Sequence, residues 1–140
     1  MKILVIDGQS GRLGSQVIES LRKALPECLY TITAVGANAL ATSAMLRAGA
    51  YQPATGENAV IVQCRTADLI VGPVGIAIAD ALLGEITPAM AAAVGQAQAE
   101  RILLPSHQCG SCVVGVAPMT RQQLVDEAVR EIMTRIELPF

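Results

Sequence analysis

The chain begins with a short apolar run, "KILVI", at residues 2–6. A continuous run of branched aliphatic residues is typical of a strand that is buried on both faces of a sheet. Comparable runs predict further strands at 30–36, 59–63, 68–72 and 101–105, and a shorter one predicts a strand at 112–116.

Between these runs, apolar residues recur at intervals of three and four, which is the spacing of one helix face. The first helix carries Leu13, Val17, Ile18, Leu21 and Leu25 on this face, and Pro26 ends it. Further helices are predicted at 39–49, 75–83, 88–99 and 121–137, with N-caps at Asn38, Thr87 and Thr120. Pro88 suits a first helical position, and Gln123 completes a capping box with Thr120.

Strands that alternate with helices, and that are apolar throughout, indicate a largely parallel sheet covered on both faces. Crossover connections in such sheets are right-handed. We therefore expect residues 1–140 to form a single-domain α/β fold, a doubly wound, mostly parallel, Rossmann-like three-layer sandwich.

The carboxyl ends of parallel strands share one edge of a sheet, and ligands bind there. Four segments expected at this edge are rich in glycine and polar residues: "DGQSGRLG", "VGANALATS", "GPVG" and "PSHQCGSC". The turns expected at the opposite edge, such as "ALPEC", are ordinary. The polar rim is the candidate binding surface. Glu57 and Asn58 belong to "ATGEN", which the sequence does not assign to either edge.

The glycine-rich turn after the first strand offers a place for an anion. A helix N-terminus has unpaired amides and a positive dipole end, and glycines let a phosphate approach them. The leading hypothesis is that this turn binds a nucleotide or another phosphorylated metabolite. The residues expected to bind it are Gly8, Gln9, Ser10, Gly11, Arg12, Leu13 and Gly14, with Asn38, Gly72, Pro73 and Gly75 around the remainder. A tight turn without any ligand explains the same glycines.

A second hypothesis is an NAD(P)-dependent reductase with His107 or Glu57 as proton donor. The loop reads G-x-x-G-x-x-G and resembles that of the dihydrodipicolinate reductases, whereas the standard dinucleotide fingerprint is G-x-G-x-x-G. The second strand is followed by Asn38, where a carboxylate usually binds the ribose. Glu85 is a further proton-transfer candidate. NAD(P) or another nucleotide is thus a possible cofactor, and whether the chain is an enzyme stays open.

His107, Cys109 and Cys112 form an H-x-C-x-x-C pattern that invites a metal or dithiol interpretation. Zinc requires four ligands, and the segment supplies no fourth one. A reactive dithiol usually begins a helix, whereas a strand is expected after these residues. We therefore expect no metal site.

The composition of the chain limits the kinds of molecule that it is expected to bind. Apolar residues make up 52% of the chain and charged residues 16%, with a net charge of −2 and no Trp. This composition argues against a nucleic acid as the partner. Asp80 interrupts the longest apolar stretch and Asp7 ends the first run, so we expect neither a membrane span nor a secretion signal, but a cytoplasmic protein.

Two predicted helices, at 39–49 and 75–83, have almost no polar face. Helices of this kind are normally buried on more than one side. A second subunit would cover them, and a two-fold homodimer is the commonest arrangement. A third hypothesis for the function is therefore a regulatory or scaffold oligomer that binds no ligand.

Several phrases together resemble a small bacterial family known as domain of unknown function 3842. They are "VIDGQSGRLG", "TAVGANALATSAMLRAGA", "ATGENAV", "DLIVGPVGIAIADALLGEITPAMAAAV" and "RILLPSHQC". The resemblance runs over nearly the whole chain, and it implies no established activity, substrate or cofactor.

Overall fold

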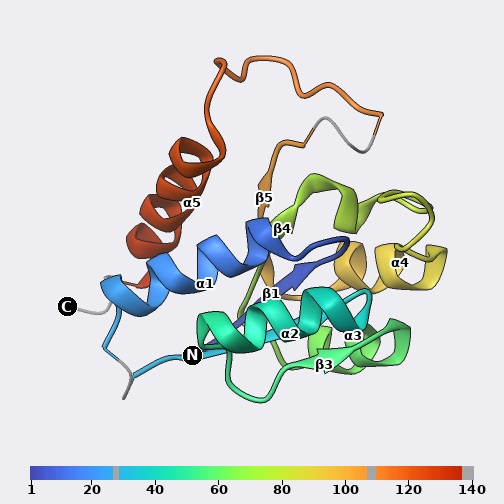
Figure 1. Cartoon of the computed structure of the whole chain (residues 1–140), viewed down its shortest axis with the longest axis horizontal. Helices are drawn as coiled ribbons and strands as arrows, with labels where there is room; N and C mark the ends of the chain where they lie inside the picture. The colour runs from blue at the N-terminus through green and yellow to red at the C-terminus, as the bar shows by residue number, and fades with distance from the viewer. Residues whose placement is uncertain (27–28, 107–109, 137–140) are drawn as a thin grey trace.

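The computed structural model describes residues 1–26, 29–106 and 110–136. Its centre is a five-stranded parallel sheet with the order β3-β2-β1-β4-β5. The strands are β1 (Lys2–Asp7), β2 (Thr31–Gly36), β3 (Ala54–Thr55), β4 (Leu69–Pro73) and β5 (Glu100–Leu104). The predicted α/β class and the parallel, doubly wound topology are confirmed (Figure 1).

The helices cover both faces of this sheet. They are α1 (Arg12–Ala24), α2 (Ala39–Ala48), α3 (Glu57–Cys64), α4 (Pro88–Gln96) and α5 (Arg121–Ile136), with a short 3-10 helix, η1 (Val74–Ala77), after β4. One hydrophobic cluster joins the sheet to α1, α2 and α5, and a second joins it to α3, η1 and α4. The result is a three-layer sandwich.

β1 lies in the centre of the sheet and explains why its sequence is apolar throughout. Ile3 and Val5 belong to the first cluster, whereas Leu4 and Ile6 belong to the second. All four side chains are fully buried. Both faces of this strand thus support a helix layer, as expected for a parallel sheet.

The predicted helix caps are also confirmed. The Asn38 Oδ1 accepts a hydrogen bond from the Ala41 amide at 2.8 Å. Before α5, the Thr120 amide donates to Gln123 Oε1 at 2.8 Å, and the Gln123 amide donates to Thr120 Oγ1 at 3.1 Å. These residues fix where α2 and α5 begin.

Thr87 caps α4, and its replacement gives a first testable prediction. The Met90 amide donates to Thr87 Oγ1 at 3.1 Å, and Pro88 follows in the first turn. We expect Thr87→Ala to lower the free energy of unfolding by about 1 kcal/mol in urea denaturation. Thr87→Ser keeps the hydroxyl and serves as the control, expected to differ little from the wild type. Equal losses in both variants would contradict a capping role.

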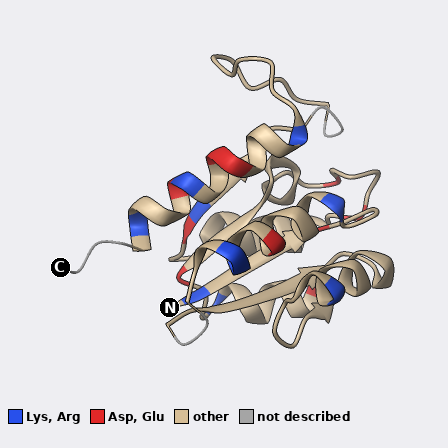
Figure 2. Cartoon of the chain, turned by 60° about the vertical axis from the view of Figure 1, so that its left-hand side comes forward, with Lys and Arg blue, Asp and Glu red and all other residues tan. Residues whose placement is uncertain are grey.

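Three predicted elements are wrong. Residues 59–63, expected as a strand, lie inside helix α3. The helix expected at 75–83 is only the short η1, followed by turns through residue 85. The segment 112–116, expected as a strand, forms none and is exposed throughout. It belongs to an exposed loop, residues 110–120, that carries no charged residue (Figure 2).

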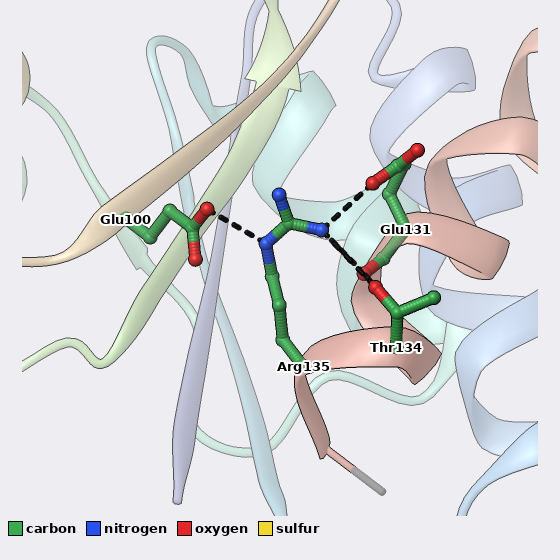
Figure 3. A network of polar contacts seen from close by, with 4 residues as sticks. All are labelled: Glu100, Glu131, Thr134 and Arg135. Atoms are coloured by element: carbon green, nitrogen blue, oxygen red, sulfur yellow. Dashed lines mark hydrogen bonds and ion pairs between the residues drawn. The ribbon is translucent and has the colours of Figure 1, made fainter. Parts of the chain in front are cut away.

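A polar network fastens the end of α5 to the start of β5 (Figure 3). Arg135 Nε lies 2.8 Å from Glu100 Oε1, and Arg135 Nη1 lies 2.8 Å from Glu131 Oε2. The same Nη1 donates to the Glu131 carbonyl at 2.7 Å and to Thr134 Oγ1 at 3.3 Å. Partly exposed pairs of this kind contribute little stability, so α5 is held mainly by its buried residues, Val125, Ala128, Ile132 and Ile136.

Within the described ranges, no helix combines the length and the hydropathy needed to cross a lipid bilayer.

Candidate functional site

A pocket of about 330 Å³ opens at the carboxyl edge of the sheet. It lies where the chain, having built β1, β2 and β3 in one direction, returns to place β4 on the other side of β1. This switch point is the usual ligand site of doubly wound folds. The lining residues are Asp7, Gly8, Gln9, Ser10, Arg12, Leu13, Pro73, Leu82, Pro105, Ser106, Arg121 and Leu124.

Asp7, the last residue of β1, organises the floor of this pocket. Its Oδ1 accepts a hydrogen bond from the Gly8 amide and its Oδ2 accepts one from the Gly14 amide, each at 2.8 Å. The side chain is buried, and burial raises the pKa of Asp7 above its ordinary value of 3.8. The nearby Glu85 charge also raises it, whereas the two amides and the Arg121 charge oppose the change.

Glu85 lies in the segment before α4 and bridges two loops of the rim. Its Oε1 accepts a hydrogen bond from the Gln9 amide at 2.7 Å, and its Oε2 accepts one from Asn38 Nδ2 at 2.5 Å. The same Asn38 nitrogen donates to the Gln9 carbonyl at 3.0 Å. The protein's own carboxylates therefore occupy the amides of Gly8, Gln9 and Gly14.

The glycines of the loop are required by internal packing. Gly11 has φ +72°, and a Cβ there would lie 2.8 Å from the Ala41 Cα of α2. A Cβ on Gly8 would lie 2.9 Å from Leu82 Cδ1, and one on Gly14 would lie 2.7 Å from Met45 Sδ. The close backbone approach inferred from the sequence is real. The atoms that approach these glycines belong to α2 and to Leu82 of the same chain.

The loop still presents donors to the pocket. In the described part of the chain, the amides of Ser10, Arg12 and Leu13 have no hydrogen-bond acceptor. All three residues line the pocket; Arg12 and Leu13 open α1, and Ser10 precedes its N-cap, Gly11. An acceptor in the pocket would satisfy these amides; those of Arg12 and Leu13 are first-turn amides, which every helix leaves unpaired within its own backbone.

Two arginines from distant parts of the sequence face the same pocket. Arg12 is the first residue of α1 and Arg121 is the first residue of α5. Neither helix has an acidic residue in its first turn. Among described residues, neither arginine forms an ion pair or side-chain hydrogen bond. Cations are disfavoured at helix N-termini, so an anion between these two groups would be stabilising. The Asp7 carboxyl group lines the same pocket and interacts with the Arg121 charge, so it offsets part of this positive charge.

The other predicted ligand-binding residues are divided. Pro73 ends β4 and lines the pocket. Gly72 is buried inside β4, where a Cβ would lie 2.3 Å from the Ile6 carbonyl oxygen of β1, so its role is strand packing. Gly75 is buried in η1, and Asn38 caps α2; neither lines the pocket.

Of the two catalytic candidates, only Glu57 lies within the described residues, and it is not part of this pocket. Glu57 is exposed at the start of α3, next to the edge strand β3, and is not a lining residue. His107 and Cys109 lie outside the described residues. Cys112 is exposed in the loop before α5. Within the described ranges, no three His, Cys, Asp or Glu side chains are grouped so as to hold a metal ion.

The sequence interpretation missed Asp7, Ser106 and Arg121 as site residues. Asp7 had a usable signal, since it directly follows a buried strand and precedes the glycine turn. Arg121 had a weaker one, because it follows the capping threonine of a clear helix. Their meeting depends on the order of the strands.

The fold and the pocket define the class of this protein. It is a doubly wound, Rossmann-like α/β protein with a pocket at the switch point of the sheet. The chain belongs to the family described as a domain of unknown function, DUF3842, whose family model matches residues 2–137. This confirms the resemblance noted in the sequence. The search of curated proteins found no match.

Proposed function

We propose that the switch-point pocket binds the phosphate group of a small phosphorylated metabolite or nucleotide. The observation that carries the proposal is the convergence of Arg12 and Arg121 on one pocket from the starts of two helices. The phosphate lies between these guanidinium groups and accepts hydrogen bonds from the open amides of α1.

Electrostatics supports this placement. Two helix N-termini add their positive dipole ends to two guanidinium charges, which favours an anion at their meeting point. Guanidinium groups bind phosphate through paired hydrogen bonds. The hydroxyl-bearing residues Ser10 and Ser106 line the same pocket. The proposal does not depend on the spacing of the glycines, because internal packing accounts for them.

Ligand-induced stabilisation tests this proposal. Inorganic phosphate, pyrophosphate and ribose 5-phosphate are added to the full chain, and thermal unfolding and calorimetric titration are measured. A ligand at about a hundredfold excess over its Kd should add about 2.7 kcal/mol to the free energy of unfolding. Arg12→Ala and Arg121→Ala should each weaken binding about tenfold, through loss of one charge-assisted contact.

Arg130→Ala is the matched control for Arg121→Ala. Arg130 lies on the same helix, is exposed, and pairs with Glu127 instead of lining the pocket. We expect its replacement to leave phosphate affinity unchanged. The proposal is wrong if no phosphate compound binds the wild-type chain, or if all three arginine variants lose affinity equally.

Self-association remains a separate proposal. Leu40 is 63% exposed and Leu46 is 55% exposed on α2, so one chain leaves this predicted apolar helix partly uncovered. Sedimentation equilibrium of the wild type and of Leu40→Glu distinguishes a dimer that uses this helix from a monomer.

A further inference from the structure

We infer that the pocket selects compact phosphate monoesters and excludes dinucleotides, because Leu82 and Glu85 occupy the part of the binding edge that an adenosine would need. This inference rests on the proposed function and narrows its ligand class. It concerns the crevice between the loop after β1 and the loop after β2.

The protein's own side chains occupy this crevice. A Cβ built on Gly8 would meet Leu82 Cδ1 at 2.9 Å, Glu85 Oε1 at 3.2 Å and Ala37 Cβ at 3.4 Å. Residues 8 and 37 follow β1 and β2, respectively, so the segment before α4 lies between the two strand ends. The hydrogen bonds of Glu85 to the Gln9 amide and to Asn38 Nδ2 then join the two loops.

In doubly wound folds that bind dinucleotides, part of the ligand lies in the region that Glu85 occupies here. A dinucleotide lies across the carboxyl edge of the sheet, its pyrophosphate rests on the first helix, and an acidic residue after the second strand accepts the ribose hydroxyls. Here the polar residue in the loop after β2 is Asn38, and its side-chain amide nitrogen already donates a hydrogen bond to Glu85. The internal carboxylate therefore takes the partners that a ribose and a pyrophosphate would use.

The filling segment is anchored in the core. Ile86 is fully buried and Leu82 is 3% exposed, and both pack in the cluster with α4. The Asp80 amide donates to the Ile86 carbonyl at 2.7 Å, and the Ile86 amide donates to the Ala81 carbonyl at 3.2 Å. Moving Glu85 far enough to admit a nucleoside would therefore disturb buried leucine and isoleucine side chains.

The space that remains suits a small carbon skeleton. The pocket lining combines Arg12 and Arg121 with the apolar side chains of Leu13, Pro105 and Leu124. Its volume is about 330 Å³, and no aromatic side chain of the described residues lines it. A base would find no stacking partner there.

A comparison of two probes tests the selectivity. Ribose 5-phosphate and NAD are titrated into the wild-type chain by calorimetry at one salt concentration. We expect ribose 5-phosphate to bind at least about tenfold more tightly than NAD. Equal affinity, or a preference for NAD, overturns the inference, whatever the variants do.

Two variants of Glu85 separate its volume from its charge. Glu85→Ala removes the bridge and frees the Gln9 amide and Asn38 Nδ2, so NAD affinity should rise about fivefold or more relative to ribose 5-phosphate. Glu85→Gln keeps the volume and removes the charge, so both probes should gain affinity by a similar factor. Urea denaturation of each variant establishes that it is folded at the titration temperature.

The outcomes distinguish this inference from the proposed function. If ribose 5-phosphate binds in an Arg12- and Arg121-dependent manner but NAD binds as well, the phosphate site stands and the selectivity is wrong. If a folded Glu85→Ala chain keeps the wild-type ratio of the two affinities, Glu85 does not determine the selectivity. If neither compound nor inorganic phosphate binds, both proposals are wrong.

Discussion

Replacing Gly36 with alanine is expected to lower the free energy of unfolding by about 3 kcal/mol, at the upper end of the cost of overpacking. A Cβ at this last position of β2 would lie 2.3 Å from Thr42 Oγ1 and 2.5 Å from the Thr42 amide nitrogen. Thr42 cannot withdraw freely, because its amide and its hydroxyl both donate to the Asn38 carbonyl, at 3.1 and 3.0 Å. The added methyl group must therefore separate β2 from α2.

Gly95→Ala is the matched control, and its sign should be opposite. Gly95 lies in α4, and apart from the adjoining residues and backbone of its own helix no atom lies within 4 Å of the position that a Cβ would take, so alanine fits without displacement. Alanine in a helix is more favourable than glycine by roughly 0.5–1 kcal/mol. Urea denaturation of both variants measures the two effects. A stable Gly36→Ala chain would mean that β2 and α2 are not as close as described.

Asp7→Ala should have a comparably large effect, again about 3 kcal/mol, because it leaves two buried amides without an acceptor. These are the amides of Gly8 and Gly14, each 2.8 Å from a carboxylate oxygen. Asp7→Asn keeps one acceptor and turns an N–H group toward the other amide, so it should cost roughly half as much. Urea denaturation at neutral pH measures both losses.

Asp68→Ala provides the comparison for a solvated aspartate. Asp68 Oδ2 also accepts a backbone hydrogen bond, from the Lys2 amide at 2.7 Å, but the residue is exposed. Water can replace this acceptor, so the loss should stay below about 1 kcal/mol. Equal losses of unfolding free energy at Asp7 and Asp68 would show that burial of the Gly8 and Gly14 amides contributes nothing to the effect.

The same buried aspartate, Asp7, predicts a pH dependence. Burial raises the pKa of Asp7 in the folded chain above its ordinary value of 3.8. Between these two pKa values, the folded chain holds a proton that the unfolded chain has lost. The stability that this proton provides is complete below pH 3.8 and is lost as the pH rises through the folded pKa. The difference in unfolding free energy between wild type and Asp7→Asn should therefore change across this window, and a constant difference would contradict the raised pKa.

Pattern in the sequence correctly predicted two kinds of element: a strand that is buried on both faces, and helices that begin at a capping side chain. β1 is apolar on both faces, and α2, α4 and α5 begin at side chains that cap them. For these elements, local preference and tertiary position agree, so pattern alone is sufficient.

Helix α3 shows where pattern failed. Val60, Ile61 and Val62 favour a strand by their branching, yet they belong to the crossover between β3 and β4, and such a crossover is usually helical. The correct signal was the pair Val60 and Cys64, which are buried one helical turn apart. The exposed segment 112–116 failed for a related reason, since branched residues form a strand only beside a neighbour.

Several residues of the candidate pocket could be named from the sequence, and others could not. Ser10, Arg12, Leu13 and Pro73 were named and line the pocket, whereas Gly72 packs against β1 and Gly75 is buried in η1. Arg121 lies far from Arg12 in the sequence, and only the return of α5 to the face of α1 brings both to the pocket. Glu85 was named for proton transfer, but both of its oxygens accept internal hydrogen bonds. The spacing of residues along the chain reveals neither the approach of Arg121 to Arg12 nor the hydrogen bonds of Glu85.

The small size of β3 affects how this sheet can meet other molecules. With only Ala54 and Thr55 paired to β2, this border offers a foreign strand almost no ladder to extend. The other border, β5, is longer, but Glu100 and Arg101 are exposed on it. Charged side chains at a border discourage the edge-to-edge addition that leads to fibrils. Both edge strands of the parallel sheet, β3 and β5, therefore disfavour the addition of strands from other chains, although the strands of the sheet are apolar.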